Sequence, residues 1–277
     1  MKAYLKDLLK KIKLYHPLQS AYRAAINFTR NKYYRLTYLK SKGPGFTCNF
    51  CGASYQKFVP EYPPADILHA IETNHVIAGY GENVYCPNCM SKNRERLVLA
   101  VLQHDLAIAG RTILHFSPEK HLFNYLEDKA SVTTVDIMPG FYKRIDRSVG
   151  HADATALAFC DESFDMIIAN HILEHIPKDT TAMKEMWRVL KKNGVAILQV
   201  PYSLELATTL EDPLINDPAK QAYLFGQKDH VRIYALQDYL RRLEISGFKV
   251  KVLSPEYLKK YAMHAIQDME SLVMCFK

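Results

Sequence analysis

The chain has 277 residues, of which 48% are hydrophobic and 23% are charged, so it has the composition of a globular protein with one large domain or a domain and a smaller module. No stretch approaches the roughly 18 consecutive apolar residues of a membrane span, which excludes an integral helical membrane protein. Lysines interrupt the first leucines, which excludes the hydrophobic region of a signal peptide, and we expect a cytoplasmic protein.

The net charge of +7 belongs to a basic N-terminal arm. Residues 1–43 hold eleven lysines and arginines against one acidic residue, a net +10, whereas the rest carries −3. Apolar residues recur among the lysines at helical spacing, at Leu5, Leu8, Leu9 and Ile12. This pattern predicts a basic amphipathic helix, which is typical of peripheral contact with anionic membranes. Packing on its own domain or a second subunit, as in a homo-oligomer, and binding of nucleic acid stay open as alternatives, nucleic acid being the weakest.

Four of the six cysteines form two CxxC pairs, Cys48–Cys51 and Cys86–Cys89. The two-residue spacer lets each pair chelate one ion, and four thiolates complete the tetrahedral shell of Zn²⁺. Without an export signal, this spacing favours a metal over disulfides. The sequence therefore predicts a structural zinc site in a module of treble-clef or zinc-ribbon type at residues 44–109.

Other features of this module follow from local signals. Ser91 is the predicted N-cap of a helix that follows the second cysteine pair and links the module to the next domain. The proline-containing segment between the pairs is predicted to be a lid-like insertion. The two remaining cysteines, Cys160 and Cys275, are predicted to be small core residues.

From residue 110 the pattern changes to alternating strands and helices. Short apolar runs predict strands over 111–116 and 131–136, and the second ends in Asp136. Between them, Ser117 followed by Pro118 and Glu119 predicts the first turn of a helix. Because Asp136 follows this turn by about the interval at which an acid meets ribose hydroxyls in nucleotide-binding folds, it is a candidate ligand residue. A cap or turn aspartate is the alternative.

A second candidate region spans residues 153–175. Asp153 precedes a turn, and the apolar run 164–169 predicts a buried strand that leads to Asn170 and His171. Ligands bind at the carboxyl ends of strands in open α/β sheets, so chemistry is expected at these two residues. A helix is predicted next. His171 and His175 would share one face of it with Glu174 between them, but the order H-I-L-E-H differs from the HExxH metal motif. We interpret this helix as structural, with His175 packed in the core.

The succession ILHFSPE, VTTVD, ADATALAFCDESFDMIIANHILEHI and MWRVLKKNGVAILQVP resembles the class I S-adenosylmethionine-dependent methyltransferases, particularly the type 11 group. The resemblance covers residues 111–277 and implies an α/β fold: a Rossmann-like seven-stranded sheet with helices on both faces. It assigns residues 110–277 to this domain and implies a final antiparallel pair over 247–253 and 271–276. A four-cysteine module whose Cys-Pro-Asn-Cys knuckle leads to Ser91, Arg94 and Arg96 is similar to one subgroup.

The resemblance also implies roles for individual residues in binding S-adenosylmethionine. Asp136 would accept hydrogen bonds from both ribose hydroxyls. Asp153 would bind the adenine amino group next to the backbone amide of Ala154, or serve only as a turn former. Asn170 and His171 would lie beside the sulfonium.

The first loop departs from the family, which has an acid and two or three glycines there. This chain has His115, Phe116, Ser117 and Glu119 instead, so the backbone must take another path. Glu119 would then supply the carboxylate for the ammonium group of the cofactor.

The acid–histidine pair Asp229 and His230 is the predicted catalytic group, in a region where the acceptor would enter. Methyl transfer to oxygen requires a base, and histidine suits this task near neutral pH, so His230 is the first candidate base and His171 the second. Alternatively, the pair caps a helix that begins near Ala235. We expect methyl transfer to a hydroxyl of a small molecule or a glycan. An rRNA methyltransferase and a non-catalytic scaffold are the alternatives.

Overall fold

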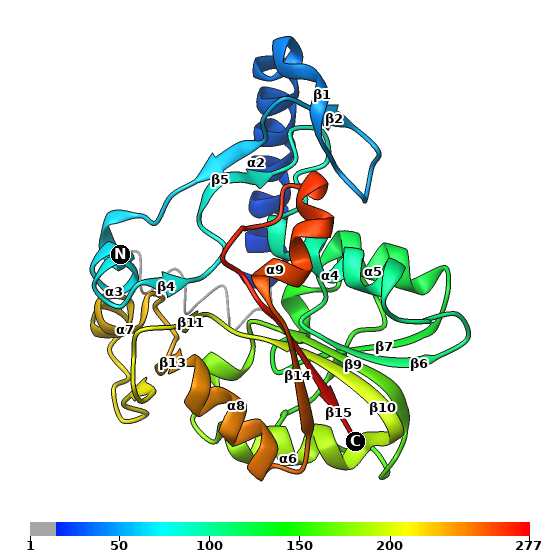
Figure 1. Ribbon diagram of the computed structural model, residues 1–277, viewed down its shortest axis with the longest axis vertical. Coiled ribbons are helices and arrows are strands. Elements are labelled where there is room, and N and C mark those ends of the chain that lie inside the picture. Colours follow the sequence, from blue (N-terminus) through cyan, green and yellow to red (C-terminus); the bar gives the residue numbers. More distant parts are fainter. Residues whose placement is uncertain (1–14) are drawn as a thin grey trace.

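The computed structural model describes residues 15–277, so the amphipathic helix predicted over Leu5 to Ile12 lies outside the described part. The first described element is the long helix α2 (Tyr15–Thr37), which stands at the top of the molecule in Figure 1 and is followed by a short 3₁₀ turn, η1 (Leu39–Ser41). Among residues 15–277, no helix is both long and apolar enough to cross a membrane.

A seven-stranded sheet forms the centre of the fold. Its strand order is β14-β15-β10-β9-β6-β7-β8, in which β15 alone runs antiparallel to its neighbours. The strands are β6 (Thr112–Phe116), β7 (Ser131–Asp136), β8 (Gly150–His151), β9 (Phe164–Asn170), β10 (Leu190–Gln199), β14 (Lys249–Leu253) and β15 (Leu272–Phe276). The order reverses between β6 and β9, which is where open α/β sheets bind ligands. The predicted α/β sheet, including its final antiparallel pair, is confirmed.

Alternate residues of the central strands face two separate cores, as the two-residue period of a strand requires. From β9, Ile167 and Ala169 face one core, whereas Met166 and Ile168 face the other. Helices α6 (Asp179–Val189) and α8 (Leu236–Ile245) cover the first face. Helices α4 (Asn93–His104), α5 (Lys120–Glu127) and α9 (Pro255–Leu258), followed by the 3₁₀ turn η4 (Lys259–His264), cover the second. Because both faces are buried, the central parts of these strands, such as 166–169 in β9 and 195–198 in β10, are continuously apolar.

The cysteine-containing segment forms two small antiparallel sheets of two strands each. Strand β1 (Lys42–Thr47) pairs with β2 (Ser54–Tyr55), and β3 (Val59–Glu61) pairs with β5 (Gly81–Tyr85). Helix α2 packs on this segment through Tyr34, together with Tyr38 directly after the helix, and Arg35 donates a 2.7 Å hydrogen bond to the carbonyl of Asn88. The second half of the basic arm therefore packs on its own chain.

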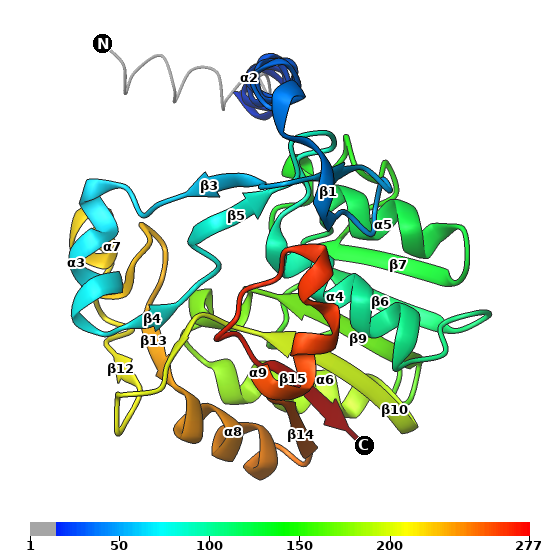
Figure 2. The same cartoon turned by 45° about the horizontal axis from the view of Figure 1, so that its top comes forward.

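The insertion between the cysteine pairs is anchored to the C-terminal half of the chain. Helix α3 (Ala65–Thr73) packs against α7 (Pro218–Phe225), as Figure 2 shows. Strand β4 (Val76–Ile77) joins a second sheet of order β12-β13-β11-β4, whose other strands are β11 (Tyr202–Ser203), β12 (Leu210–Glu211) and β13 (Arg232–Ala235). The predicted insertion is thus held by strand pairing as well as by helix packing.

Three local predictions differ from the structure. Helix α4 begins at Asn93 after Lys92, because the hydroxyl of Ser91 lies against the sulfurs of Cys48 and Cys89 instead of capping the helix. Helix α5 begins only at Lys120, because Ser117 has a left-handed backbone with φ of 44°. Of the two cysteines predicted in the core, Cys275 is buried, but Cys160 is exposed in the loop before β9.

Candidate functional site

A cavity of about 780 Å³ lies at the carboxyl ends of β6, β7 and β9. Its lining includes eight of the nine predicted cofactor-binding residues: Phe116, Ser117, Glu119, Asp136, Asp153, Ala154, Asn170 and His171. The ninth, His115, is fully buried behind the wall and reaches the cavity only through Glu119. The volume falls within the range of small-molecule sites.

The first loop forms without glycine because Ser117 takes the left-handed conformation itself. Its hydroxyl donates a short hydrogen bond to one carboxylate oxygen of Asp136, and the amide of Met138 donates a 2.6 Å bond to the other. Asp136 is therefore fixed at the end of β7 with its carboxylate on the cavity. The side chains of Ile137 and Met138, each about half exposed, add an apolar wall beside it.

Glu119 is the carboxylate of the first loop. Its two oxygens contact His115 Nε2 at 3.0 Å and Asn170 Nδ2 at 3.2 Å. Burial alone would raise the pKa of Glu119, but the interaction with His115, the positive charge of Arg94 and the hydrogen bond from Asn170 together outweigh burial and keep the pKa below its usual value. The cavity therefore holds an ionised carboxylate at this position. The carbonyl oxygen of the Asn170 side chain is buried without a hydrogen-bond partner.

Arg94 also lines the cavity, although the sequence did not single it out as a site residue. It comes from the first turn of α4, directly after the cysteine module. Its Nε atom is buried and has no hydrogen-bond partner. In the sequence, Arg94 is only a basic residue shortly after the second cysteine pair. That it reaches the cavity follows from the packing of α4 against the sheet.

Asp153 lies near the start of the loop that follows β8. One of its oxygens accepts hydrogen bonds from the amide and the hydroxyl of Thr155, at 2.8 and 2.7 Å. These two bonds lower the pKa of Asp153. The residue is thus a turn former, as the alternative held, and its carboxylate also lines the cavity next to Ala154.

The segment after β9 is not the predicted helix. His171 has a left-handed φ of 55°, and only a 3₁₀ turn, η3 (Leu173–His175), precedes Pro177, so α6 begins at Asp179. A proline cannot donate the backbone hydrogen bond that a continuing helix requires, which accounts for the break. His171 Nδ1 lies 3.4 Å from the carboxylate of Glu174. His175, predicted in the core, is half-buried and lines the cavity.

Only one residue of the predicted pair Asp229 and His230 lines the cavity. Asp229 lines it, whereas His230 is buried behind it and its Nδ1 contacts the carbonyl of Phe225 at 3.0 Å. Burial lowers the pKa of His230 to about 4. Strand β13 separates the pair from α8, so the pair does not cap that helix. His171 is the predicted base that faces the cavity directly.

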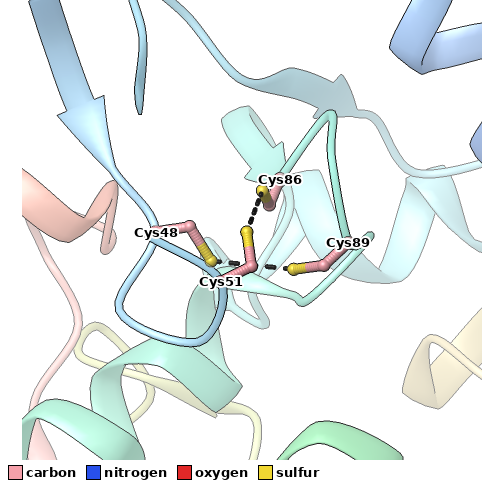
Figure 3. A group of neighbouring side chains, drawn as sticks. All are labelled: Cys48, Cys51, Cys86 and Cys89. Atoms are coloured by element: carbon pink, nitrogen blue, oxygen red, sulfur yellow. Dashed lines mark hydrogen bonds between the residues drawn. The ribbon is translucent and has the colours of Figure 1, made fainter. Parts of the chain in front are cut away.

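The four cysteines of the two pairs converge, as Figure 3 shows. The sulfurs of Cys48 and Cys89, and those of Cys51 and Cys86, are 3.7 Å apart, and all four lie within 4.8 Å of one another. The backbone turns of the two pairs match: Gly52 and Met90, each directly after a pair, both have left-handed φ values. Sulfurs bound to one tetrahedral zinc are about 3.8 Å apart, so the cluster has the dimensions of such a site.

Comparison with known proteins finds similarity over the central part of the chain. A family model described as "Methyltransferase domain" matches residues 104–198. The ubiquinone/menaquinone biosynthesis C-methyltransferase UbiE of Pasteurella multocida (strain Pm70) is 27% identical over 113 residues, 35% of this chain and 41% of that protein. The match thus spans less than half the length of this relative.

Solved structures of S-adenosylmethionine-dependent methyltransferases are also similar. One from Mesorhizobium loti has 17% identity and a TM-score of 0.48, and covers 65% of this chain and 98% of its own. One from Archaeoglobus fulgidus has 14% identity and a TM-score of 0.46, and covers 66% of this chain and 94% of its own. Residues 104–198, which contain strands β6 to β9 and most of β10 of the central sheet, are thus similar to a methyltransferase domain.

Proposed function

We propose that the protein transfers the methyl group of S-adenosylmethionine to a hydroxyl oxygen of a small molecule or a glycan. The observation that supports this best is the cavity itself, which presents Asp136, Glu119 and His171 together at the switch point of the sheet. Its volume of about 780 Å³ is near the upper end of small-molecule sites and leaves room for a second ligand beside the cofactor.

The residues present fit the cofactor. Asp136 would hold the ribose hydroxyls, Ile137 and Met138 the adenine face, and Glu119 the ammonium group. Arg94, whose Nε atom lacks a partner, would bind the carboxylate of the methionine part. When bound, S-adenosylmethionine supplies a methyl group on a positively charged sulfur, and the protein mainly has to align the acceptor and remove its proton.

The charge of the cavity favours a neutral acceptor over nucleic acid. Its lining carries four acidic side chains and two basic ones, Arg94 and Lys178. A phosphate backbone requires an excess of basic groups, and the chain beyond the N-terminal arm carries a net −3. Methyl transfer to rRNA therefore remains the less favoured alternative.

His171 is the base that this arrangement supports. Burial, and secondarily the positive charge of Arg94, lowers the pKa of His171, so its imidazole is neutral and can accept a proton at pH 7. Because the neutral form is the active one, the rate should be level above pH 7 and fall as the pH drops below the usual histidine pKa of about 6.5.

We expect His171→Asn to lower kcat for a hydroxyl acceptor by about 10²- to 10⁴-fold, the usual loss when a general base is removed. The measurement is release of S-adenosylhomocysteine with panels of hydroxyl, amine and carbon-acid acceptors. The control is His69→Asn, at a histidine that stacks on Tyr223 away from the cavity. Turnover only with amines or carbon acids, or a variant as active as the native protein, would reject hydroxyl methylation with His171 as base.

Arg94→Met should weaken binding of S-adenosylmethionine by roughly 10- to 100-fold, because it removes a charged hydrogen bond worth about 1.5–3 kcal/mol. Calorimetry with S-adenosylmethionine and with methylthioadenosine, which lacks the amino acid part, separates the proposed contact from a general effect. The variant should bind methylthioadenosine as the native protein does. Equal weakening for both ligands would show that Arg94 only maintains the shape of the cavity.

We also propose that the cysteine cluster binds one Zn²⁺. The four thiols are close enough to share one ion, and four sulfurs leave no open position, so the ion would be structural. The turns that hold them are supported by backbone bonds to the cysteines themselves, such as that from the Gly52 amide to the Cys48 carbonyl at 2.8 Å.

A further inference from the structure

A second cluster of potential metal ligands lies beside the cavity, 85 residues or more from the last cysteine of the zinc cluster along the chain. It comprises one carboxylate oxygen of Glu174 and one ring nitrogen each of His175 and His230, all within 4.8 Å of one another. The first two residues come from η3 and the third from the turn before β13. The fold thus brings together ligands that are 55 residues apart in sequence.

Glu174 is a buried carboxyl group that the fold leaves without hydrogen bonds. Its side chain is 1% exposed, and both of its carboxylate oxygens are buried without a hydrogen-bond partner. The nearest polar atoms are His171 Nδ1 at 3.4 Å and His230 Nε2 at 3.9 Å. A buried carboxylate is costly unless a cation or a set of donors balances it. A positive charge beside Glu174 would therefore stabilise the folded protein.

Both histidines hold one ring nitrogen against a backbone carbonyl, which leaves the other nitrogen available to a metal ion when the ring is neutral. His230 Nδ1 contacts the carbonyl of Phe225 at 3.0 Å, and His175 Nδ1 contacts the carbonyl of Asp229 at 3.2 Å. A carbonyl only accepts, so each Nδ1 carries the hydrogen and each Nε2 is left with a lone pair. Metal-binding histidines are held in this way, with the second nitrogen donating to a carbonyl or carboxylate.

The cluster is rigidly supported. Arg232 donates to the carbonyls of Leu173, Ile176 and Pro177, and so ties β13 to η3. The amide of Val231 donates a 3.0 Å bond to the Glu174 carbonyl, and the rings of His175 and His230 pack edge to face at 4.6 Å. Because the backbone around the three side chains is held in place, only small side-chain rotations are needed for them to coordinate one ion.

We propose that Glu174, His175 and His230 bind one divalent transition-metal cation at the wall of the cavity. Two imidazoles and one carboxylate suit ions such as Mn²⁺, Fe²⁺, Co²⁺ and Zn²⁺ and leave coordination positions open. His175 lines the cavity, so the open positions face the acceptor space. If the proposed hydroxyl transfer is correct, the ion would attract the acceptor oxygen and ease loss of its proton, a role that rests on the proposed function.

The test measures metal binding alone and so stands apart from methyl transfer. The zinc-loaded protein is titrated with Mn²⁺, and free Mn²⁺ is followed by electron paramagnetic resonance. Thiolates select zinc over manganese, so the cysteine cluster does not compete. We expect one Mn²⁺ per chain, and a rise in the unfolding temperature with Mn²⁺ concentration.

Glu174→Gln and His230→Gln should each abolish this binding, and the second variant decides the result if the first fails to fold. The matched control is Glu205→Gln, which alters an exposed pair, His75 and Glu205, of similar separation at 3.5 Å. Failure to retain Mn²⁺ at about 1 mM would overturn the proposal and indicate that a protonated histidine balances Glu174. Equal binding by the native protein and His230→Gln would overturn it as well.

Discussion

Asp136→Ala is expected to weaken binding of S-adenosylmethionine by about 100-fold or more. A carboxylate that accepts both ribose hydroxyls makes two charged hydrogen bonds, each worth about 1.5–3 kcal/mol. The Asp136 carboxylate is preorganised at the end of β7, because Ser117 and the Met138 amide each donate a hydrogen bond to one of its oxygens. Calorimetry on the folded variant is the measurement.

The same experiment tests the non-catalytic alternative. Asp128→Ala, at an exposed aspartate that ends α5, serves as control and should bind as the native protein does. Ser117→Ala, which removes only the supporting hydroxyl, should lose less affinity than Asp136→Ala. If the native protein gives no heat at high cofactor concentration, the cavity does not bind S-adenosylmethionine and the scaffold alternative is favoured.

Cys86→Ser is expected to reduce the zinc content from one ion per chain to none and to lower the unfolding temperature by more than about 10 °C. Binding of a structural zinc ion contributes about 10 kcal/mol or more to the folding of small modules. Cys86 is fully buried, and its sulfur lies 3.7 Å from that of Cys51, so its loss leaves three thiolates for the ion. Metal analysis and thermal unfolding provide the two measurements.

Cys160→Ser is the matched control, because Cys160 is an exposed thiol outside the cluster. It should leave both the zinc content and the unfolding temperature unchanged. A Cys86→Ser protein that retains zinc, or a zinc-free native protein that unfolds at the same temperature as the zinc-loaded one, would contradict a structural zinc site.

The sheet could be predicted from the sequence because its strands are buried on both faces. The run 166–169, for example, is continuously apolar and is bounded by the polar residues Asp165 and Asn170. The cysteine spacing likewise predicted which four side chains converge. In both cases the signal lies within a few neighbouring residues. The neighbouring strands carry the same apolar pattern, and the second cysteine pair has the same spacing as the first.

The details of the site depended on contacts that no local pattern contains. A serine was expected to cap α5, but Ser117 takes the conformation of a missing glycine and binds Asp136. Likewise, His171 and His175 were assigned to one helix by their spacing, yet the chain turns at His171. Which of the two predicted catalytic residues, Asp229 and His230, faces the cavity was set by the path of the backbone before β13.

Arg96 connects the cysteine module to a segment near the C-terminus. Its fully buried guanidinium donates to the carbonyls of Asn83, Val84 and Ser91 within the cysteine module, and to those of His264 and Ala265 near the C-terminus. During synthesis the module leaves the ribosome long before those last two acceptors exist. Until they arrive, the cation lacks two of its partners, so the module should stay open to proteases on a nascent chain and become resistant only when the final strand pair is complete.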